Sequence, residues 1–297
     1  MIQASARRSG QLILPQKAME AQSFGQRLRP VDGSWYMSQA RNPDTEFLDK
    51  RIESAVRFDL DTVKDTTTCL PHMLPPPHVM QGYVDRVGLS RTRDTVLVYT
   101  HAGSFSAARV WWTFRAFGFQ AHVLQGGLAG WQAVGGAVQS GQLPPPPPEK
   151  PREPVVLDPR MVATFEDIQA ALKDERAIII DARSAGRFSG TEKEPRPGLA
   201  CGHIPGSVNL PFTEFFEPGS EFSRFKSVDE MRKLFESRGV NLEISTPIIS
   251  SCGSGVTACV VSLAMQLCGR PAELCPVYDG SWAEWGARAD TPKQTLG

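Results

Sequence analysis

The segment Pro247-Ile-Ile-Ser-Ser-Cys252-Gly-Ser-Gly-Val-Thr257-Ala-Cys259 decides the fold class. Its first residues predict a short buried strand, and the apolar run Val256–Cys268 predicts a helix. A cysteine between the two would lie at the carboxyl end of a strand, where open α/β sheets bind their ligands. Short strands and amphipathic helices alternate along the chain, so we expect an α/β fold in which helices cover both faces of a mainly parallel sheet.

The same pattern occurs twice, at an offset of about 150 residues. Arg29–Asp32 and Val96–Tyr99 in the first half correspond to Ile178–Asp181 and Pro247–Ser250 in the second. A repeat of this length has the size of a domain and exceeds the period of a solenoid. The chain of 297 residues is therefore expected to form two domains of the same fold.

A proline-rich stretch separates the two halves. Leu143-Pro-Pro-Pro-Pro-Pro-Glu149 favours an extended polyproline II conformation, because proline has no backbone N–H to donate. We expect a linker over residues 141–156, with one domain over residues 1–140 and the other over residues 157–297. A proline-recognition role is the alternative for this stretch.

The composition excludes several classes of function. Lys+Arg and Asp+Glu are equal at 32 each, which argues against binding to nucleic acid or to a membrane surface through bulk charge. No apolar run is long enough to cross a bilayer. The six cysteines contain no Cys-x-x-Cys pair and the five histidines have no metal-ligand spacing, so we expect no metal.

The start of the chain bears on its location. Residues 1–19 contain Arg7, Arg8 and Lys17 but no acidic residue, a composition that fits part of a mitochondrial transit peptide and equally a frayed terminus. We expect an intracellular protein with reduced thiols, either mitochondrial or cytoplasmic.

The glycines around Cys252 point to a reactive thiol. Gly253 and Gly255 can adopt backbone angles that a side chain would forbid, so the loop can curl with its N–H groups pointing inward. Such a concavity at a helix start favours a thiolate, which is the nucleophilic form of cysteine. A buried structural cysteine is the alternative. A cysteine phosphatase is excluded, because Ala258 stands where its phosphate-binding arginine is needed.

These motifs together resemble the tandem-domain rhodanese-type sulfurtransferases, and within them the enzymes that use 3-mercaptopyruvate. The resemblance implies two rhodanese-like domains, of which only the second is catalytic, and no cofactor. The matching stretches cover both halves of the chain: Asp32–Tyr36, Phe58–Asp61, His72–Pro75, Arg109–Gly118, Asp181–Gly190, Glu194–Gly198, Gly202–Phe212, Cys252–Cys259 and Tyr278–Trp285.

The first half lacks the nucleophile. Its loop reads Tyr99-Thr-His101-Ala-Gly-Ser, so that His101 falls near the place of Cys252. We therefore expect the first domain to serve as a wall of the active-site cleft. Glu53-Ser54 replaces Pro205-Gly206 of the second half, which predicts a turn of different shape.

The resemblance also implies the roles of further residues. Ser254, His72 and Asp61 would form a hydrogen-bonded triad that relays a proton. Without the resemblance, the sequence favours a histidine on the rim of the site for His72 and a helix cap for Asp61. Arg187 and Arg196 would bind the carboxylate of an α-keto acid. The loop residues Gly253, Gly255, Val256 and Thr257 would complete the substrate site.

The implied reaction moves one sulfur atom. Cys252 would take the sulfur of 3-mercaptopyruvate as a persulfide, release pyruvate, and pass the sulfur to a small thiol, thioredoxin or cyanide. The neutral Gly253 and Ser254 favour a monocarboxylate donor over dianionic thiosulfate, which we expect as a secondary substrate. The alternatives are a thiosulfate sulfurtransferase, a sulfur-relay protein that serves a partner such as one feeding tRNA thiolation, and a silent scaffold. Cys201 is a candidate redox regulator.

Overall fold

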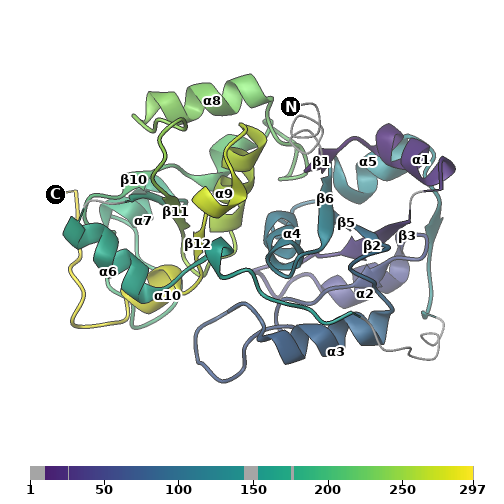
Figure 1. The fold of residues 1–297 in the computed structure, drawn as a ribbon, viewed down its shortest axis with the longest axis horizontal. Helices are drawn as coiled ribbons and strands as arrows, with labels where there is room; N and C mark the ends of the chain where they lie inside the picture. The colour runs from purple at the N-terminus through teal and green to yellow at the C-terminus, as the bar shows by residue number, and fades with distance from the viewer. Residues whose placement is uncertain (1–10, 26, 144–152, 175–176, 297) are drawn as a thin grey trace. The chain divides into compact units, whose positions relative to one another are not determined.

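The computed structural model describes residues 11–25, 27–143, 153–174 and 177–296 (Figure 1). It divides into two compact units. The first comprises residues 1–66, 74–158 and 217–225, and the second comprises residues 67–73, 159–216 and 226–297. Each unit therefore includes a short segment from the other half of the sequence. The predicted domain limits stay a prediction, and residues 144–152 of the predicted linker lie outside the described residues.

The first unit is built on a parallel five-stranded sheet. Its strand order is β1-β6-β5-β2-β4, with β1 (Leu12–Ile13), β2 (Leu28–Asp32), β4 (Val56–Arg57), β5 (Thr95–Tyr99) and β6 (Gln120–Leu124). A separate antiparallel pair joins β3 (Arg51–Ile52) to β7 (Val138–Gln139). The helices are α1 (Pro15–Ser23), α2 (Pro43–Asp49), α3 (Pro77–Val87), α4 (Ala107–Ala116) and α5 (Gly127–Ala133).

Helices cover both faces of this sheet, as predicted. Leu97 and Tyr99 of β5 belong to a buried cluster with Phe47 of α2 and Trp131 of α5. The residues that alternate with them along β5 point to the opposite face and are also fully buried. Helix α4 contributes nothing to that cluster but packs against β5 and β6. Burial on both faces explains why the strand is continuously apolar.

The second unit repeats this architecture. Its parallel sheet has the order β10-β9-β11-β12-β8, with β8 (Val162–Ala163), β9 (Ile178–Asp181), β10 (Val208–Asn209), β11 (Ile248–Ser251) and β12 (Val277–Tyr278). Counted along the chain, the strands of both sheets follow the order 1-5-4-2-3. The predicted duplication and α/β fold are thus confirmed. The helices are α6 (Phe165–Asp174), α7 (Ala185–Ser189), α8 (Val228–Ser237), α9 (Ala258–Leu267) and α10 (Ser281–Trp285), with 3-10 turns η1 (Pro159–Met161), η2 (Phe212–Phe215) and η3 (Ala272–Leu274).

The turn that was expected to differ between the halves has the same shape in both. Ser54 has a φ of 60° and Gly206 a φ of 74°, so each places its third residue in the left-handed region. In both turns the N–H of the fourth residue donates to the carbonyl of the first, at 3.0 and 3.1 Å. The prediction was wrong because Ser54 adopts the left-handed conformation, although glycine adopts it at a lower cost in free energy.

Candidate active site

Cys252 lies directly after β11, in the six-residue loop that ends where α9 begins at Ala258. The helix starts two residues later than the predicted Val256. The side chain of Cys252 is buried, with 2% of the residue exposed. Its N–H donates to Ser281 Oγ at 3.1 Å, and its carbonyl accepts from Trp282 N at 3.0 Å. The first turn of α10 therefore fixes both backbone groups of the cysteine.

Ser281 was not identified from the sequence. Its hydroxyl also donates to the carbonyl of Tyr278 at 2.7 Å, and its backbone has a φ of 50°. A serine in the left-handed region is uncommon and costs free energy. In this conformation the hydroxyl of Ser281 accepts from Cys252 N. We therefore regard Ser281 as a positioning residue. The matching Tyr278–Trp285 motif was the one signal for it in the sequence.

The loop after Cys252 contains several unpaired backbone donors. Within the described residues, the N–H groups of Gly253, Ser254, Val256 and Thr257 donate to no protein acceptor. The chain bends at Gly255, which has a φ of 76°, and then enters α9 with the positive end of the helix toward the loop. Unpaired N–H groups at the start of a helix form a site suited to an anion or an ionised sulfur.

Two members of the predicted triad meet in the second unit. His72 belongs to the segment 67–73 that packs there, and its Nδ1 lies 3.2 Å from Ser254 Oγ. Both residues are buried, and His72 has a φ of 58°, in the left-handed region. The third member, Asp61, is part of the first unit, where its carboxylate accepts from Trp35 Nε1 at 2.9 Å. The pairing of Asp61 with His72 stays a prediction.

Arg187 lies against the loop. A Cβ atom built on Gly253 would be 2.8 Å from Arg187 Nη2, although Gly253 itself does not have a positive φ. Of the two glycines that can adopt backbone angles forbidden to a side chain, Gly255 therefore does so and Gly253 does not. A larger residue at this position would require the guanidinium of Arg187 to move. Arg196 is half-buried in the same unit, and its contact with substrate stays a prediction.

A buried carboxylate, absent from the predicted site, holds Arg187 in place. The side chain of Glu194 is 2% exposed, and it accepts from Arg187 Nε at 3.1 Å and Nη2 at 2.6 Å. It also accepts from Arg183 Nη1 at 2.8 Å, while Arg183 pairs with Asp181 at 2.5 Å. Burial alone would lower the pKa of Arg183, but the two carboxylates outweigh it and raise this pKa. The charges of two arginines and two carboxylates thus balance one another beside the loop.

The corresponding loop of the first unit carries no thiol. Because the strand registers match, Thr100 occupies the position of Cys252. Its carbonyl accepts from Leu128 N at 3.1 Å, as that of Cys252 does from α10. His101 is one residue further along, and its Nε2 lies 3.2 Å from the carboxylate of Asp32. The role of this unit as a cleft wall stays a prediction.

The remaining cysteines do not resemble Cys252. Burial raises the pKa of the Cys268 thiol to about 11 and that of Cys275 to about 12, and Cys259 is fully buried on α9. Cys69 and Cys201 are exposed. The described residues hold no cluster of three or more His, Cys, Asp or Glu side chains able to bind a metal.

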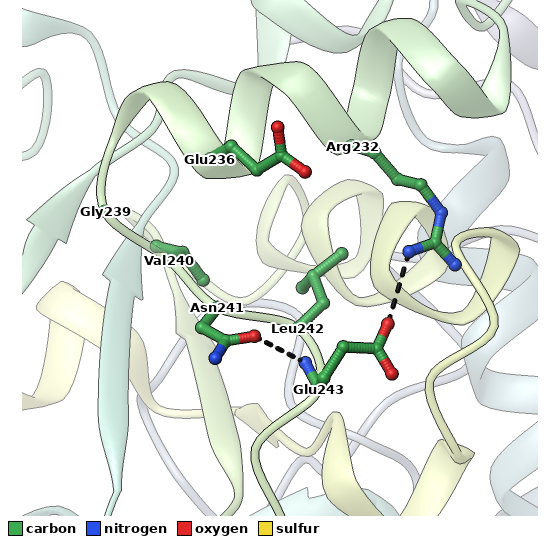
Figure 2. A pocket seen from close by; sticks show the side chains of 7 residues that line it. All are labelled: Arg232, Glu236, Gly239, Val240, Asn241, Leu242 and Glu243. Atoms are coloured by element: carbon green, nitrogen blue, oxygen red, sulfur yellow. Dashed lines mark hydrogen bonds and ion pairs between the residues drawn. The ribbon is translucent and has the colours of Figure 1, made fainter.

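A surface cavity of about 300 Å³ in the second unit contains none of these groups (Figure 2). It lies between α8 and residues 239–243, and Figure 2 shows Arg232 and Glu243 pointing toward each other across it, at 3.3 Å. An exposed ion pair of this kind contributes little to the stability of the fold, and neither residue is a nucleophile. We therefore assign the candidate active site to the loop after β11.

The comparisons with known proteins agree with this assignment. The Rhodanese-like domain model matches residues 38–134 and 164–288. The chain is 42% identical to human 3-mercaptopyruvate sulfurtransferase, over 92% of this chain and 90% of the human one. It is 36% identical to the Arabidopsis thaliana "Thiosulfate/3-mercaptopyruvate sulfurtransferase 1, mitochondrial", over 91% and 74% of the two chains. The crystal structure of SseA from Escherichia coli, whose title names 3-mercaptopyruvate sulfotransferases, has a TM-score of 0.78 and 34% identity, over 92% and 99%. Matches in both halves of the chain, at these identities, show that it belongs to the rhodanese family as a sulfurtransferase with two rhodanese-like domains.

Proposed function

We propose that this sulfurtransferase uses 3-mercaptopyruvate as its sulfur donor and carries the sulfur as a persulfide on Cys252. The observation that supports the proposal most directly is the loop itself, where a thiol stands at the end of β11 before a row of unpaired N–H groups. The human relative is named for the same donor.

The reaction begins with attack of the Cys252 thiolate on the thiol sulfur of the donor. The new bond joins the two sulfur atoms, and the carbon–sulfur bond of the donor breaks. Its electron pair stays on carbon, so the leaving group is the enolate of pyruvate, which takes up one proton. The unpaired N–H groups of the loop stabilise the charge on the outer sulfur of the persulfide.

The protein groups around the loop have separate tasks in this proposal. Arg187 and Arg196 bind the donor carboxylate. The N–H groups of Gly253, Ser254, Val256 and Thr257 bind the reacting sulfur. Ser254 Oγ and His72 Nδ1, which lie 3.2 Å apart, move the proton that the enolate takes up. Asp61 would hold the imidazole of His72 in the required tautomer.

The outer sulfur then passes to a second nucleophile. A small thiol, thioredoxin or cyanide attacks it and restores the Cys252 thiolate. Thiosulfate is the second donor we propose, since the Arabidopsis relative carries both donors in its name. A protein acceptor, as in sulfur relay, is the alternative for the last step.

The proposed location is mitochondrial or cytoplasmic. The Arabidopsis relative is named mitochondrial, while residues 1–10, which include part of the suspected transit peptide, lie outside the described residues. Among the helices that the structure describes, none combines the length and apolar character required to cross a membrane.

The test is peptide-resolved mass spectrometry within the first turnover. Mixing the protein with 3-mercaptopyruvate should add one sulfur atom to the peptide that contains Cys252 and release an equal amount of pyruvate. The Cys252→Ser variant should keep the fold and lose both signals. Sulfur on Cys69 or Cys201 instead, or pyruvate release by the variant, would refute the assignment. Adding thioredoxin or a small thiol next shows which acceptor removes the sulfur faster.

A further inference from the structure

An arginine–glutamate pair lies beside the loop of each unit. In the second unit, Glu194 accepts from Arg187 Nε and Nη2 at 3.1 and 2.6 Å. In the first, Glu46 accepts from Arg41 Nε and Nη2, each at 2.7 Å. In each case the guanidinium also lies close to a glycine of the loop. A Cβ atom on Gly253 would meet Arg187 at 2.8 Å, and one on Gly103 would meet Arg41 at 3.2 Å.

Only the second pair lies beside a thiol, so only there does its charge affect a reacting group. The three heavy atoms nearest to a Cβ built on Gly253 all belong to the guanidinium of Arg187. Glu194 is almost fully buried, so its interaction with Arg187 is weakly screened by solvent. Asp181 and Arg183 balance each other in the same cluster. The carboxylate of Glu194 therefore reduces, without abolishing, the positive charge that Arg187 presents to an incoming anion.

We propose that Glu194 determines which donor charge the site prefers. It is a positioning residue that holds Arg187 over Gly253 and leaves the loop with a nearly balanced charge. A donor with one negative charge is then accepted, and a dianion such as thiosulfate gains no additional attraction. This inference rests on the proposed function for its donors, but the charge effect itself can be measured without sulfur transfer.

The first measurement uses two alkylating reagents of equal size. Iodoacetate is an anion and iodoacetamide is neutral, so the ratio of their rates on Cys252 cancels the fraction of ionised thiol. Mass spectrometry of the Cys252 peptide separates this signal from the exposed Cys69 and Cys201. Glu194→Gln should raise the iodoacetate-to-iodoacetamide ratio about tenfold, because one negative charge near the site is removed. An unchanged ratio would overturn the proposal.

The second measurement compares donors. Glu194→Gln should raise kcat/KM for thiosulfate relative to that for 3-mercaptopyruvate by about the same factor. If the substitution only loosened the structure, kcat/KM would fall for both donors and the ratio between them would not change. Glu194→Asp, which keeps the charge and changes the geometry, should leave the alkylation ratio close to that of the parent protein.

The first unit supplies the matched control. Glu46→Gln breaks the same bidentate pair beside Thr100, where no thiol is present, and should change neither ratio. If Glu194→Gln alone does not fold, Arg187→Gln is compared with the Arg187→Gln/Glu194→Gln double variant. The single variant should disfavour iodoacetate and the double variant should restore the ratio. A shifted alkylation ratio without any sulfur transfer would refute the proposed function and support this inference.

Discussion

Gly253→Ala tests whether Arg187 is held against the active-site loop. Gly253 does not have a positive φ, so its backbone tolerates alanine and any penalty comes from contact. The new Cβ would lie 2.8 Å from Arg187 Nη2, and ordinary contact begins at 3.4 Å. The guanidinium must therefore move by about 0.6 Å.

The hydrogen bonds to Glu194 decide the cost of this movement. They measure 3.1 and 2.6 Å, so a shift of about 0.6 Å takes the longer one beyond hydrogen-bonding distance and weakens the shorter one. Losing one hydrogen bond between charged groups costs about 1.5–3 kcal/mol, reduced here because Arg187 is partly exposed. We expect KM for 3-mercaptopyruvate to rise about tenfold, with a smaller change in kcat.

The assay is pyruvate release at varied donor concentration, carried out in a double-mutant cycle with Arg187→Ala. If contact with the guanidinium is the cause, Gly253→Ala adds no penalty when Arg187 is absent. Denaturant unfolding of the same four proteins separates binding from stability. A KM that is unchanged in the single variant, or a penalty that persists without Arg187, would refute this reading of the loop.

The structure predicts the outcome of three further substitutions. Ser254→Ala should lower kcat with 3-mercaptopyruvate about 100-fold, since it removes the hydroxyl that contacts His72; initial-rate kinetics with an unchanged kcat would exclude the relay. Ser281→Ala should lower the free energy of unfolding by about 2 kcal/mol, since Cys252 N loses its acceptor, and Ser281→Gly should cost less because it also relieves the positive φ; denaturant unfolding ranks the two. Cys275→Ser should make the loss of stability above pH 9 shallower. Burial raises the pKa of Cys275 from 9.0 to about 12, so between these values only the unfolded chain ionises and the free energy of unfolding falls by about 1.4 kcal/mol per pH unit; equal slopes for both proteins would contradict this.

The elements that local sequence dictates were predictable. The sequence Ser227-x-x-Glu230 favours a capping box, and Ser227 caps α8 in this way, while Gly239 ends the turn after the helix with a φ of 70°. The strand Ile178–Asp181 has its predicted limits because a run of buried β-branched residues leaves little choice. The duplication was visible for the same reason, since each half repeats these local patterns.

The contacts between distant residues were not predictable from pattern. Nothing in the stretch around His72 indicates that residues 67–73 pack in the second unit, because no local rule places a short irregular segment. Glu194 is one of 32 acidic residues, and its burial between two arginines depends on the tertiary fold. The family resemblance assigned roles to His72 and Arg187, and although Glu194 lies in a matching stretch, it was given no role in holding Arg187.

Comparing the two units separates what the fold supplies from what the side chains supply. Both have the same strand order, a loop at the same sheet edge and a guanidinium held by a carboxylate beside a glycine. These shared features are therefore compatible with a site that has no nucleophile, as at Thr100. The second unit differs in having a thiol at Cys252 and a histidine in contact with Ser254. Reactivity thus depends on a few substitutions at a position that the duplicated sheet provides twice, and it is at these residues that sulfur transfer should be gained or lost.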